Sequence, residues 1–152
     1  MTTAAPGERG DDVEVTTYID ASPAIVFSYF TDPERMCRWM GVTTQLDARE
    51  GGEFRIDVTN GDVAVGTYLE VVPPERVVLS WGWEGHATVP PGSSTVEVTL
   101  TPDGDGTFVR LRHSGLDVES AIRHNAGWTH YLARLAIASS GGEPGPDPNV
   151  SS

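Results

Sequence analysis

The feature that most limits the fold of this chain is its one long stretch of helical periodicity, residues 117–138. Five residues spaced at i, i+4, i+7, i+8 and i+11 share one helix face, namely His124, Trp128, Tyr131, Leu132 and Leu135. Off this stripe lie Arg123, Thr129, Arg134 and Ala138. A stripe that carries both Trp and His must be covered, and the strand-rich region upstream is the material available to cover it.

The region upstream begins with one strand and two short helices. Residues 13–19 alternate as a strand, and Ser22-Pro23 opens a helix to about residue 30, with Ser22 as its cap and Pro23 at its first position. Asp32-Pro33 repeats this signal for a helix over 34–39. The long helix can be capped by Asp117 or Ser120.

From residue 42 to residue 113 the pattern changes from helical to alternating. Six strands are predicted, at 43–49, 53–59, 63–72, 76–84, 94–101 and 107–114. Gly51-Gly52, Asn60-Gly61 and residues 103–106 are hairpin signals between them. Sequential antiparallel pairing gives an α+β fold, in which a seven-stranded curved sheet wraps around the long C-terminal helix and the two short helices stand between strands 1 and 2.

Composition places one domain between two tails. The chain has 152 residues, of which 38% are hydrophobic, so a single domain over 12–140 is expected. Residues 1–11 and 141–152 mix Pro, Gly and charge without period, and both are predicted to be disordered. No apolar run approaches the roughly 20 residues of a membrane span, and no secretory signal opens the sequence. A cytoplasmic location is the expectation.

Charge and cysteine content exclude several partners. The formal net charge is -12 and every basic residue is Arg, so nucleic acid is not an expected partner. Cys37 is the only cysteine, which excludes an intramolecular disulfide and a thiolate metal site. His124 and His130 lie six apart on one helix and cannot chelate one ion together. No metal and no cofactor are therefore expected.

The alternation of each strand predicts which side chains face the long helix. Val77, Leu79, Trp81 and Trp83 share a face of one strand, and Val96, Val98 and Leu100 share a face of the next. In the last strand Arg110 and Arg112 are poor candidates for burial, so Val109, Leu111 and His113 point inward.

These inward faces predict a binding site between sheet and helix. An aromatic wall with a few convergent polar groups is typical of a site for a small hydrophobic or aromatic molecule, and Trp39 and Met40 can close one end. We expect the ligand to be contacted by Trp39, Met40, Leu79, Trp81, Trp83, Val98, Leu111, His113, His124 and Trp128. The other reading of the same rings is plain core packing. His86 and His130 are predicted to be solvated.

The order of short motifs also resembles a known family. The motifs are IDASPAIVF (19–27), TDPE (31–34), WMG (39–41), GGEF (51–54), GTYLEVVPPER (66–76), LSW (79–81), LRHSGL (111–116) and AGWTHYL (126–132). Together they resemble the SRPBCC superfamily, specifically the branch named for the activator of the heat-shock protein 90 ATPase. The resemblance implies the helix-grip fold over about five-sixths of the chain, and similar domains bind lipids, hormones and polyketides.

Two alternatives to simple ligand binding stay open. One is a polyketide cyclase-like or aromatase-like enzyme that uses the same cavity, with His113 or His124 as general acid or base, because a partly buried imidazole titrates near neutral pH. The other is an interaction module that contacts a chaperone in the stress response, as the resemblance implies. A homodimer is also left open.

Overall fold

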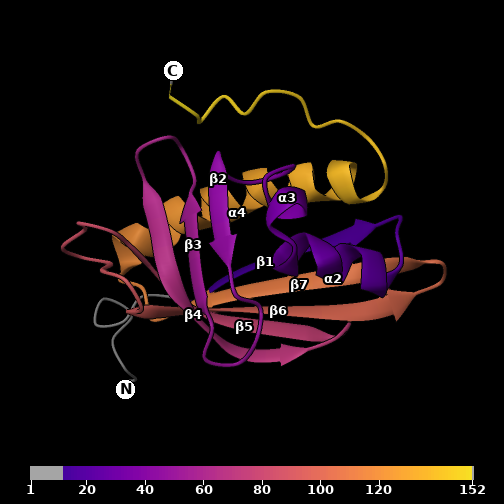
Figure 1. The fold of residues 1–152 in the computed structure, drawn as a ribbon, viewed down its shortest axis with the longest axis horizontal. Coiled ribbons are helices and arrows are strands. Elements are labelled where there is room, and N and C mark those ends of the chain that lie inside the picture. Colours follow the sequence, from indigo (N-terminus) through magenta and orange to yellow (C-terminus); the bar gives the residue numbers. More distant parts are fainter. Residues whose placement is uncertain (1–11, 152) are drawn as a thin grey trace.

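The computed structural model describes residues 12–151. The predicted N-terminal tail, residues 1–11, lies outside the described residues. The chain forms β1 (Val13–Ile19), α2 (Pro23–Thr31), α3 (Pro33–Met36), β2 (Thr43–Leu46), β3 (Glu53–Asp57), β4 (Val63–Val72), β5 (Arg76–Trp83), β6 (Ser94–Asp103), β7 (Gly106–Ser114) and α4 (Val118–Ser139), as Figure 1 shows. This is the predicted α+β helix-grip architecture. No helix of the described range has the length and apolar character needed to cross a membrane.

The sheet is antiparallel, with the strand order β1-β7-β6-β5-β4-β3-β2. Six strands follow one another as predicted, but the prediction of sequential pairing is wrong for β1. This strand pairs with β7 from Val13↔His113 to Ile19↔Thr107, so β1 and β2 form opposite edges of the sheet. The segment with α2 and α3 carries the chain from one edge to the other, which alternation within single strands cannot reveal.

The helix starts follow from their caps. Ser22 Oγ accepts a hydrogen bond from Ile25 N (3.3 Å) at the start of α2, and Asp32 Oδ1 accepts from Glu34 N (2.9 Å) at the start of α3. Of the two candidate caps of α4, Asp117 takes the role and accepts from Ser120 N. Each cap satisfies a backbone donor that the first turn leaves free. Helix α3 ends at Met36, three residues before the predicted end, and the chain reaches Met40 through turns.

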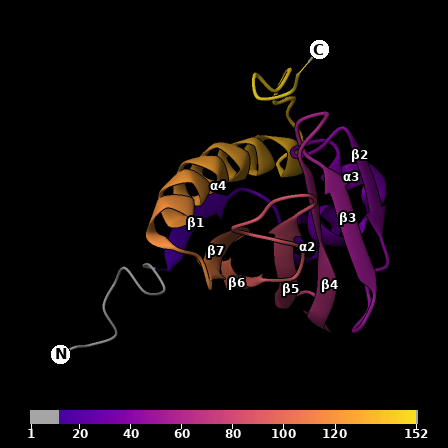
Figure 2. The same cartoon turned by 90° about the vertical axis from the view of Figure 1, so that its left-hand side faces the viewer.

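Helix α4 lies in the concave side of the sheet, and the strands follow one another in an arc around it (Figure 2). On the predicted stripe, Trp128, Tyr131, Leu132 and Leu135 are buried and His124 is half-buried. Ala138, predicted to lie off the stripe, is 4% exposed. The stripe is wider than predicted because Ala138 lies three residues after Leu135 and therefore on nearly the same side of the helix.

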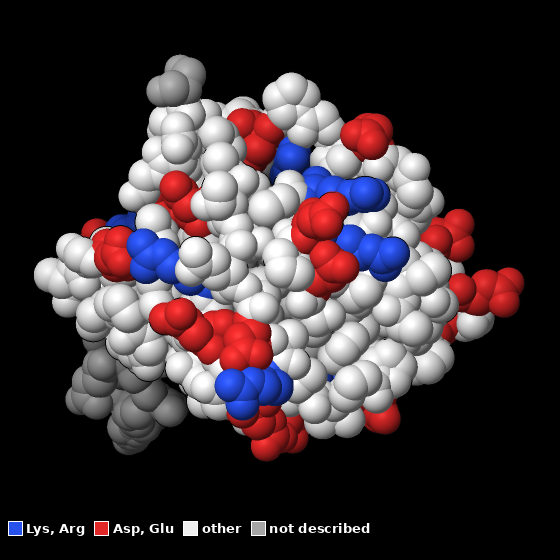
Figure 3. Space-filling view, viewed as in Figure 1, with Lys and Arg blue, Asp and Glu red and all other residues white. Residues whose placement is uncertain are grey.

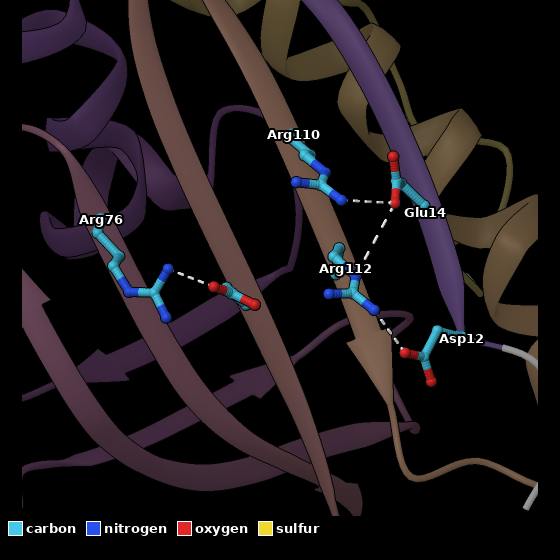
Figure 4. A network of polar contacts seen from close by, with 6 residues as sticks. Asp12, Glu14, Arg76, Arg110 and Arg112 are labelled. Atoms are coloured by element: carbon cyan, nitrogen blue, oxygen red, sulfur yellow. Dashed lines mark hydrogen bonds and ion pairs between the residues drawn. The ribbon is translucent and has the colours of Figure 1, made fainter.

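The outer face of the sheet carries charged side chains in pairs. Arg110 and Arg112 of β7 reach Glu14 and Asp12 at 3.0 and 2.7 Å (Figure 4). Arg76 pairs across the neighbouring strands with Glu70 and Glu97. Figure 3 likewise shows acidic and basic side chains side by side over the face presented there. The pairs confirm that the two arginines of β7 face outward, so Val109, Leu111 and His113 face the core.

The C-terminal segment, for which the composition predicts a disordered tail, makes several contacts with the rest of the chain. Residues 141–151 form no helix or strand, yet they turn back after α4 and run along it (Figure 1). Asp147 contacts His130 Nε2 (2.9 Å) and accepts from Tyr131 Oη (2.6 Å), and Ser151 N donates to Thr59 O (2.8 Å). The segment is rich in Pro and Gly, and such a composition predicts disorder. The contacts above are made to polar groups of other elements, and the composition of the segment alone does not show them.

Candidate functional site

A cleft of about 490 Å³ lies between β5 and the first half of α4. Its wall is mostly aromatic and apolar, and it is formed by Met40, Val58, Trp81, Trp83, Trp128 and Tyr131. Polar side chains stand around it, among them Asp62, Glu84, His86, Arg123, His124 and Asn149. This combination is characteristic of sites for small, largely apolar molecules.

Trp81 is the centre of the aromatic wall. Its ring stacks on Phe54 at 5.5 Å between centroids, and it meets Trp83 edge-on at 5.4 Å and Trp128 at 5.1 Å. The edge-on and offset geometries are those that aromatic quadrupoles favour. These contacts fix the three tryptophans of the wall relative to one another, so this side of the cleft is preformed.

His113 takes part in a chain of hydrogen bonds that joins Trp128, Ser94 and Trp81. Its ring is fully buried; Nδ1 accepts from Trp128 Nε1 (3.0 Å), and Nε2 lies 2.8 Å from Ser94 Oγ. Ser94 Oγ uses its own hydrogen to bond the Trp81 carbonyl oxygen (2.8 Å). The hydroxyl must therefore accept from His113 Nε2–H, which assigns the neutral tautomer. Burial, followed by the nearby His124, lowers the pKa of His113 to about 3.

His124 makes a similar pair nearer the cleft. Its Nδ1 lies 2.7 Å from the carbonyl oxygen of Ser120, to which it donates, and its Nε2 accepts from Trp83 Nε1 (3.0 Å). Burial lowers the pKa of His124, partly opposed by the hydrogen bond to Ser120. The rings of His113 and His124 meet edge-on at 4.9 Å. Two neutral Trp–His pairs thus lie side by side.

This geometry disfavours acid or base catalysis by either imidazole. In both rings one nitrogen donates and the other accepts within the protein, so neither ring has a free nitrogen for a ligand. A general base needs a free lone pair within hydrogen-bond reach of the substrate proton. The histidines that the sequence identified as candidate acids or bases therefore act in this structure as acceptors that hold tryptophans in place.

The ten predicted site residues divide into two groups. The cleft is lined by five of them, namely Met40, Trp81, Trp83, His124 and Trp128. The other five are buried in the packed core and do not line it: Trp39, Leu79, Val98, Leu111 and His113. Alternation assigned the correct face to Leu79, Val98, Leu111 and His113, but it does not show where along the sheet the interior is filled and where it is open.

Three contacts show that Trp39 has a packing role in the core. Its Nε1 donates to the carbonyl oxygen of Tyr29 (2.9 Å), and its own carbonyl oxygen accepts from Arg134 Nε (3.1 Å). The ring meets Phe30 edge-on at 5.2 Å. Trp39 thus joins the segment after α3 to α2 and α4, which is a packing role.

Several cleft residues escaped the sequence reasoning. Tyr131 lies on the predicted helix stripe, so the helix periodicity already pointed to it. Asp62, Arg123 and Asn149 reach the cleft only through the tertiary fold, which no local sequence pattern shows. His86, predicted to be solvated, is exposed but lines the cleft, and its Nδ1 accepts from Val89 N (3.0 Å). His130, also predicted to be solvated, is only about a third exposed because Asp147 covers it.

Gly127 is the most informative of the missed residues. It lies within α4, where Gly costs about 1 kcal/mol relative to Ala, and it lines the cleft. A Cβ built on Gly127 meets nothing within 4 Å. A side chain larger than hydrogen therefore has room at this position, on the side of α4 that lines the cleft.

The rim is more acidic than basic. Arg123 is the one Lys or Arg among the cleft-lining residues of the described chain, and it also lies 3.7 Å from Glu119. Glu84 at the rim is paired with Arg55 at 2.7 Å, and the hydrogen bond with Arg55 lowers the pKa of Glu84. Within residues 12–151, no three His, Cys, Asp or Glu side chains gather as metal ligands would.

Comparison with known proteins gives a family and a set of similar structures. The model of the family described as Activator of Hsp90 ATPase homolog 1-like protein matches residues 20–139. The AHSA1-like protein from Rhizobium etli has 43% identity, with 93% of this chain and 89% of that chain covered at a TM-score of 0.74. CalU16 from Micromonospora echinospora has 32% identity, with 86% and 76% covered at a TM-score of 0.71.

A third similar structure is DynU16, a protein in the dynemicin biosynthetic locus. It has 26% identity and a TM-score of 0.77 over 88% of this chain, which spans 49% of DynU16. No curated protein sequence matches this chain.

Proposed function

This chain belongs to the Activator of Hsp90 ATPase homolog 1-like family, and from that premise we propose that it binds a small, flat, hydrophobic molecule between β5 and α4. The observation that carries the proposal is the cleft of about 490 Å³ with three tryptophans in its wall and Gly127 open toward it. Aromatic walls favour aromatic ligands, because ring pairs add to the area removed from water.

A cleft of this size can bind a three-ring ligand with micromolar affinity. A three-ring ligand that removes about 500 Å² of apolar ligand and wall surface from water gains about 12 kcal/mol at about 25 cal/mol per Å². An association cost of about 5 kcal/mol leaves a dissociation constant in the micromolar range. The preformed wall around Trp81 keeps the ordering part of this cost small.

One similar structure supports a small-molecule role. DynU16 is a protein in a biosynthetic locus, that of dynemicin, and this setting fits a fold that holds a small organic molecule. The engaged nitrogens of His113 and His124 favour binding over the cyclase-like alternative.

The test is a titration with a neutral lipophilic fluorophore, N-phenyl-1-naphthylamine. Saturable probe emission, quenching of tryptophan emission and a higher melting temperature are expected for the wild-type protein. Absence of any saturable response from this probe and from a wider lipophilic panel would contradict the proposal.

A matched pair of variants at Gly127 locates the binding. Gly127→Ala adds one methyl group and should keep probe affinity, whereas Gly127→Leu extends a side chain into the cleft and should weaken binding about tenfold or more. Ala and Leu are both good helix formers, so both variants are expected to fold. Equal probe affinity in the two variants would place the probe elsewhere and count against this cleft.

Chaperone contact is a second candidate, which the family description favours. It predicts co-purification with the heat-shock protein 90 of the same cell and an increase in its ATPase rate. An unchanged ATPase rate with saturating protein would remove this candidate without affecting the ligand proposal.

A further inference from the structure

The C-terminal segment connects two walls of the cleft. On the α4 side, Asp147 lies 2.9 Å from His130 Nε2 and accepts a hydrogen bond from Tyr131 Oη (2.6 Å). On the side of the β3–β4 turn, Ser151 N donates to the carbonyl oxygen of Thr59 (2.8 Å). Tyr131 and Thr59 both line the cleft. The segment therefore passes from one wall to the other at the border of the cleft.

Asn149 lies between these two anchors and lines the cleft itself. Among residues 141–151 it is the one that does so. Asn149 is exposed, and its backbone N–H donates to Asp147 Oδ1 (3.0 Å). Asn149 thus forms part of the cleft wall while the anchors hold the segment in place.

Asp147 is the main anchor. Its side chain is 7% exposed, although most residues of the segment are exposed. Burying a carboxylate is costly unless hydrogen bonds compensate. Burial acts to raise the pKa of Asp147, but the hydrogen bonds from Tyr131, Asn149 and His130 outweigh it and lower the pKa. Asp147 is therefore an ionised acceptor that docks the segment on α4.

Two features of the segment determine how it responds to a ligand. It forms no helix or strand and is mostly exposed, and such segments open locally at a small fraction of the free energy of global unfolding. The cleft of about 490 Å³ is present with the segment docked, and this volume is within the range of small-molecule sites. A ligand therefore has room without displacing the segment.

We propose that the C-terminal segment is a strap whose docking is coupled to occupation of the cleft, and that Asp147 is the residue that positions it. The ligand contacts Asn149 in the docked state and not in the undocked state, so it binds the docked state more tightly. By linkage, the ligand stabilises docking by the same factor. This inference rests on the proposed function and adds a conformational step to it.

The first experiment uses the wild-type protein and follows hydrogen exchange at the backbone N–H of Ser151, whose bond to Thr59 exists in the docked state. Saturating N-phenyl-1-naphthylamine should slow this exchange about fivefold, the low end of such couplings. The N–H of Gly142, bonded to Ile137 at the end of α4, is the internal control and should not respond. Unchanged exchange at Ser151 would show an independent segment, and faster exchange would show displacement; either result overturns the proposal.

The second experiment compares two variants that remove the same charge from the segment. Asp147→Ala should weaken probe binding about two- to fivefold, because the undocked state becomes populated. Glu143→Ala changes an exposed position of the segment and should leave probe affinity unchanged. An equal loss of affinity in both variants would show an effect of charge and overturn the positioning role of Asp147.

A double variant distinguishes positioning from a general structural role. In Asn149→Ala the anchors remain but the contact with the ligand is shortened. Adding Asp147→Ala to this variant should therefore weaken probe binding much less than it does in the wild-type background. Full additivity of the two losses would overturn the coupling through Asn149.

The outcomes separate the two proposals. Probe binding that Gly127→Leu weakens, without a response of Ser151, overturns the strap and leaves the cleft as a binding site. Absence of any saturable probe binding overturns the proposed function, and the strap with it.

Discussion

Two Trp–His pairs of the same chemistry lie next to each other in this protein and have different surroundings. In the inner pair, Trp128 donates to a fully buried His113 that is also bonded to Ser94. In the outer pair, Trp83 donates to a half-buried His124, and both residues line the cleft. In the inner pair only Trp128 reaches the cleft, while His113 lies in the core, whereas both members of the outer pair border the cleft. Residue type alone therefore does not distinguish a packing role from a binding role.

The inner pair should matter most for stability. His113→Leu leaves the buried Trp128 N–H without an acceptor and should lower the free energy of unfolding by about 2–4 kcal/mol. His124→Leu, near water at the cleft, should cost about 1 kcal/mol. Denaturant unfolding of both variants checks this order, and an equal or reversed cost would erase the distinction between the pairs.

The inner pair should also give the protein a pH-dependent stability. The pKa of His113 is lowered to about 3 in the folded protein, against about 6.5 in an unfolded chain. The unfolded state therefore binds the extra proton between pH 6.5 and pH 3, so this contribution is complete above about pH 6.5 and is lost as the pH falls.

From pH 7 to pH 5 the loss due to His113 should be about 2 kcal/mol. The lowered pKa of His124 acts in the same direction. His113→Leu should remove most of this slope when unfolding is followed over pH 5–7. A variant with the same slope as the wild-type protein would show that His113 is not held neutral.

The space beside the outer pair can be tested with a single methyl group. Gly127→Ala should raise the free energy of unfolding by about 1 kcal/mol, because Ala favours the helix and the new Cβ meets nothing within 4 Å. Gly66→Ala is the packed control, since a Cβ there would lie 1.7 Å from the carbonyl oxygen of Ser80. Thermal unfolding should move in opposite directions for the two variants; a loss of stability in Gly127→Ala would mean that the cleft is filled.

The C-terminal segment should have the smallest effect on stability. Asn149 lines the cleft, and Asp147 holds the segment to His130 and Tyr131. Asp147→Ala should cost about 0.5–1 kcal/mol and speed hydrogen exchange in residues 143–151. Asp147→Asn, which can still accept from Tyr131, is the milder control. Unchanged exchange in Asp147→Ala would mean that the segment is held by something else.

The sequence predicted the fold well and the site in part. For residues 12–151, alternation located the strands and periodicity located α4, while the cap signals Ser22-Pro23 and Asp32-Pro33 located α2 and α3. Each of these signals is local in the sequence. The pairing of β1 with β7 and the docking of Asp147 on α4 escaped prediction, since both join segments far apart in the chain. Leu111 and Trp81 share the inward face of the sheet, but only tertiary packing determines which of them meets the cleft.

The most direct test of the open cleft is an NMR titration of the four indole N–H groups with N-phenyl-1-naphthylamine. A ligand between β5 and α4 should shift Trp81 and Trp83 strongly and Trp128 less, and should leave Trp39, bonded to Tyr29 in the core, unchanged. Saturable shifts in this order support a hydrophobic binding site in the cleft. Bound probe that leaves Trp81 and Trp83 unmoved would contradict it.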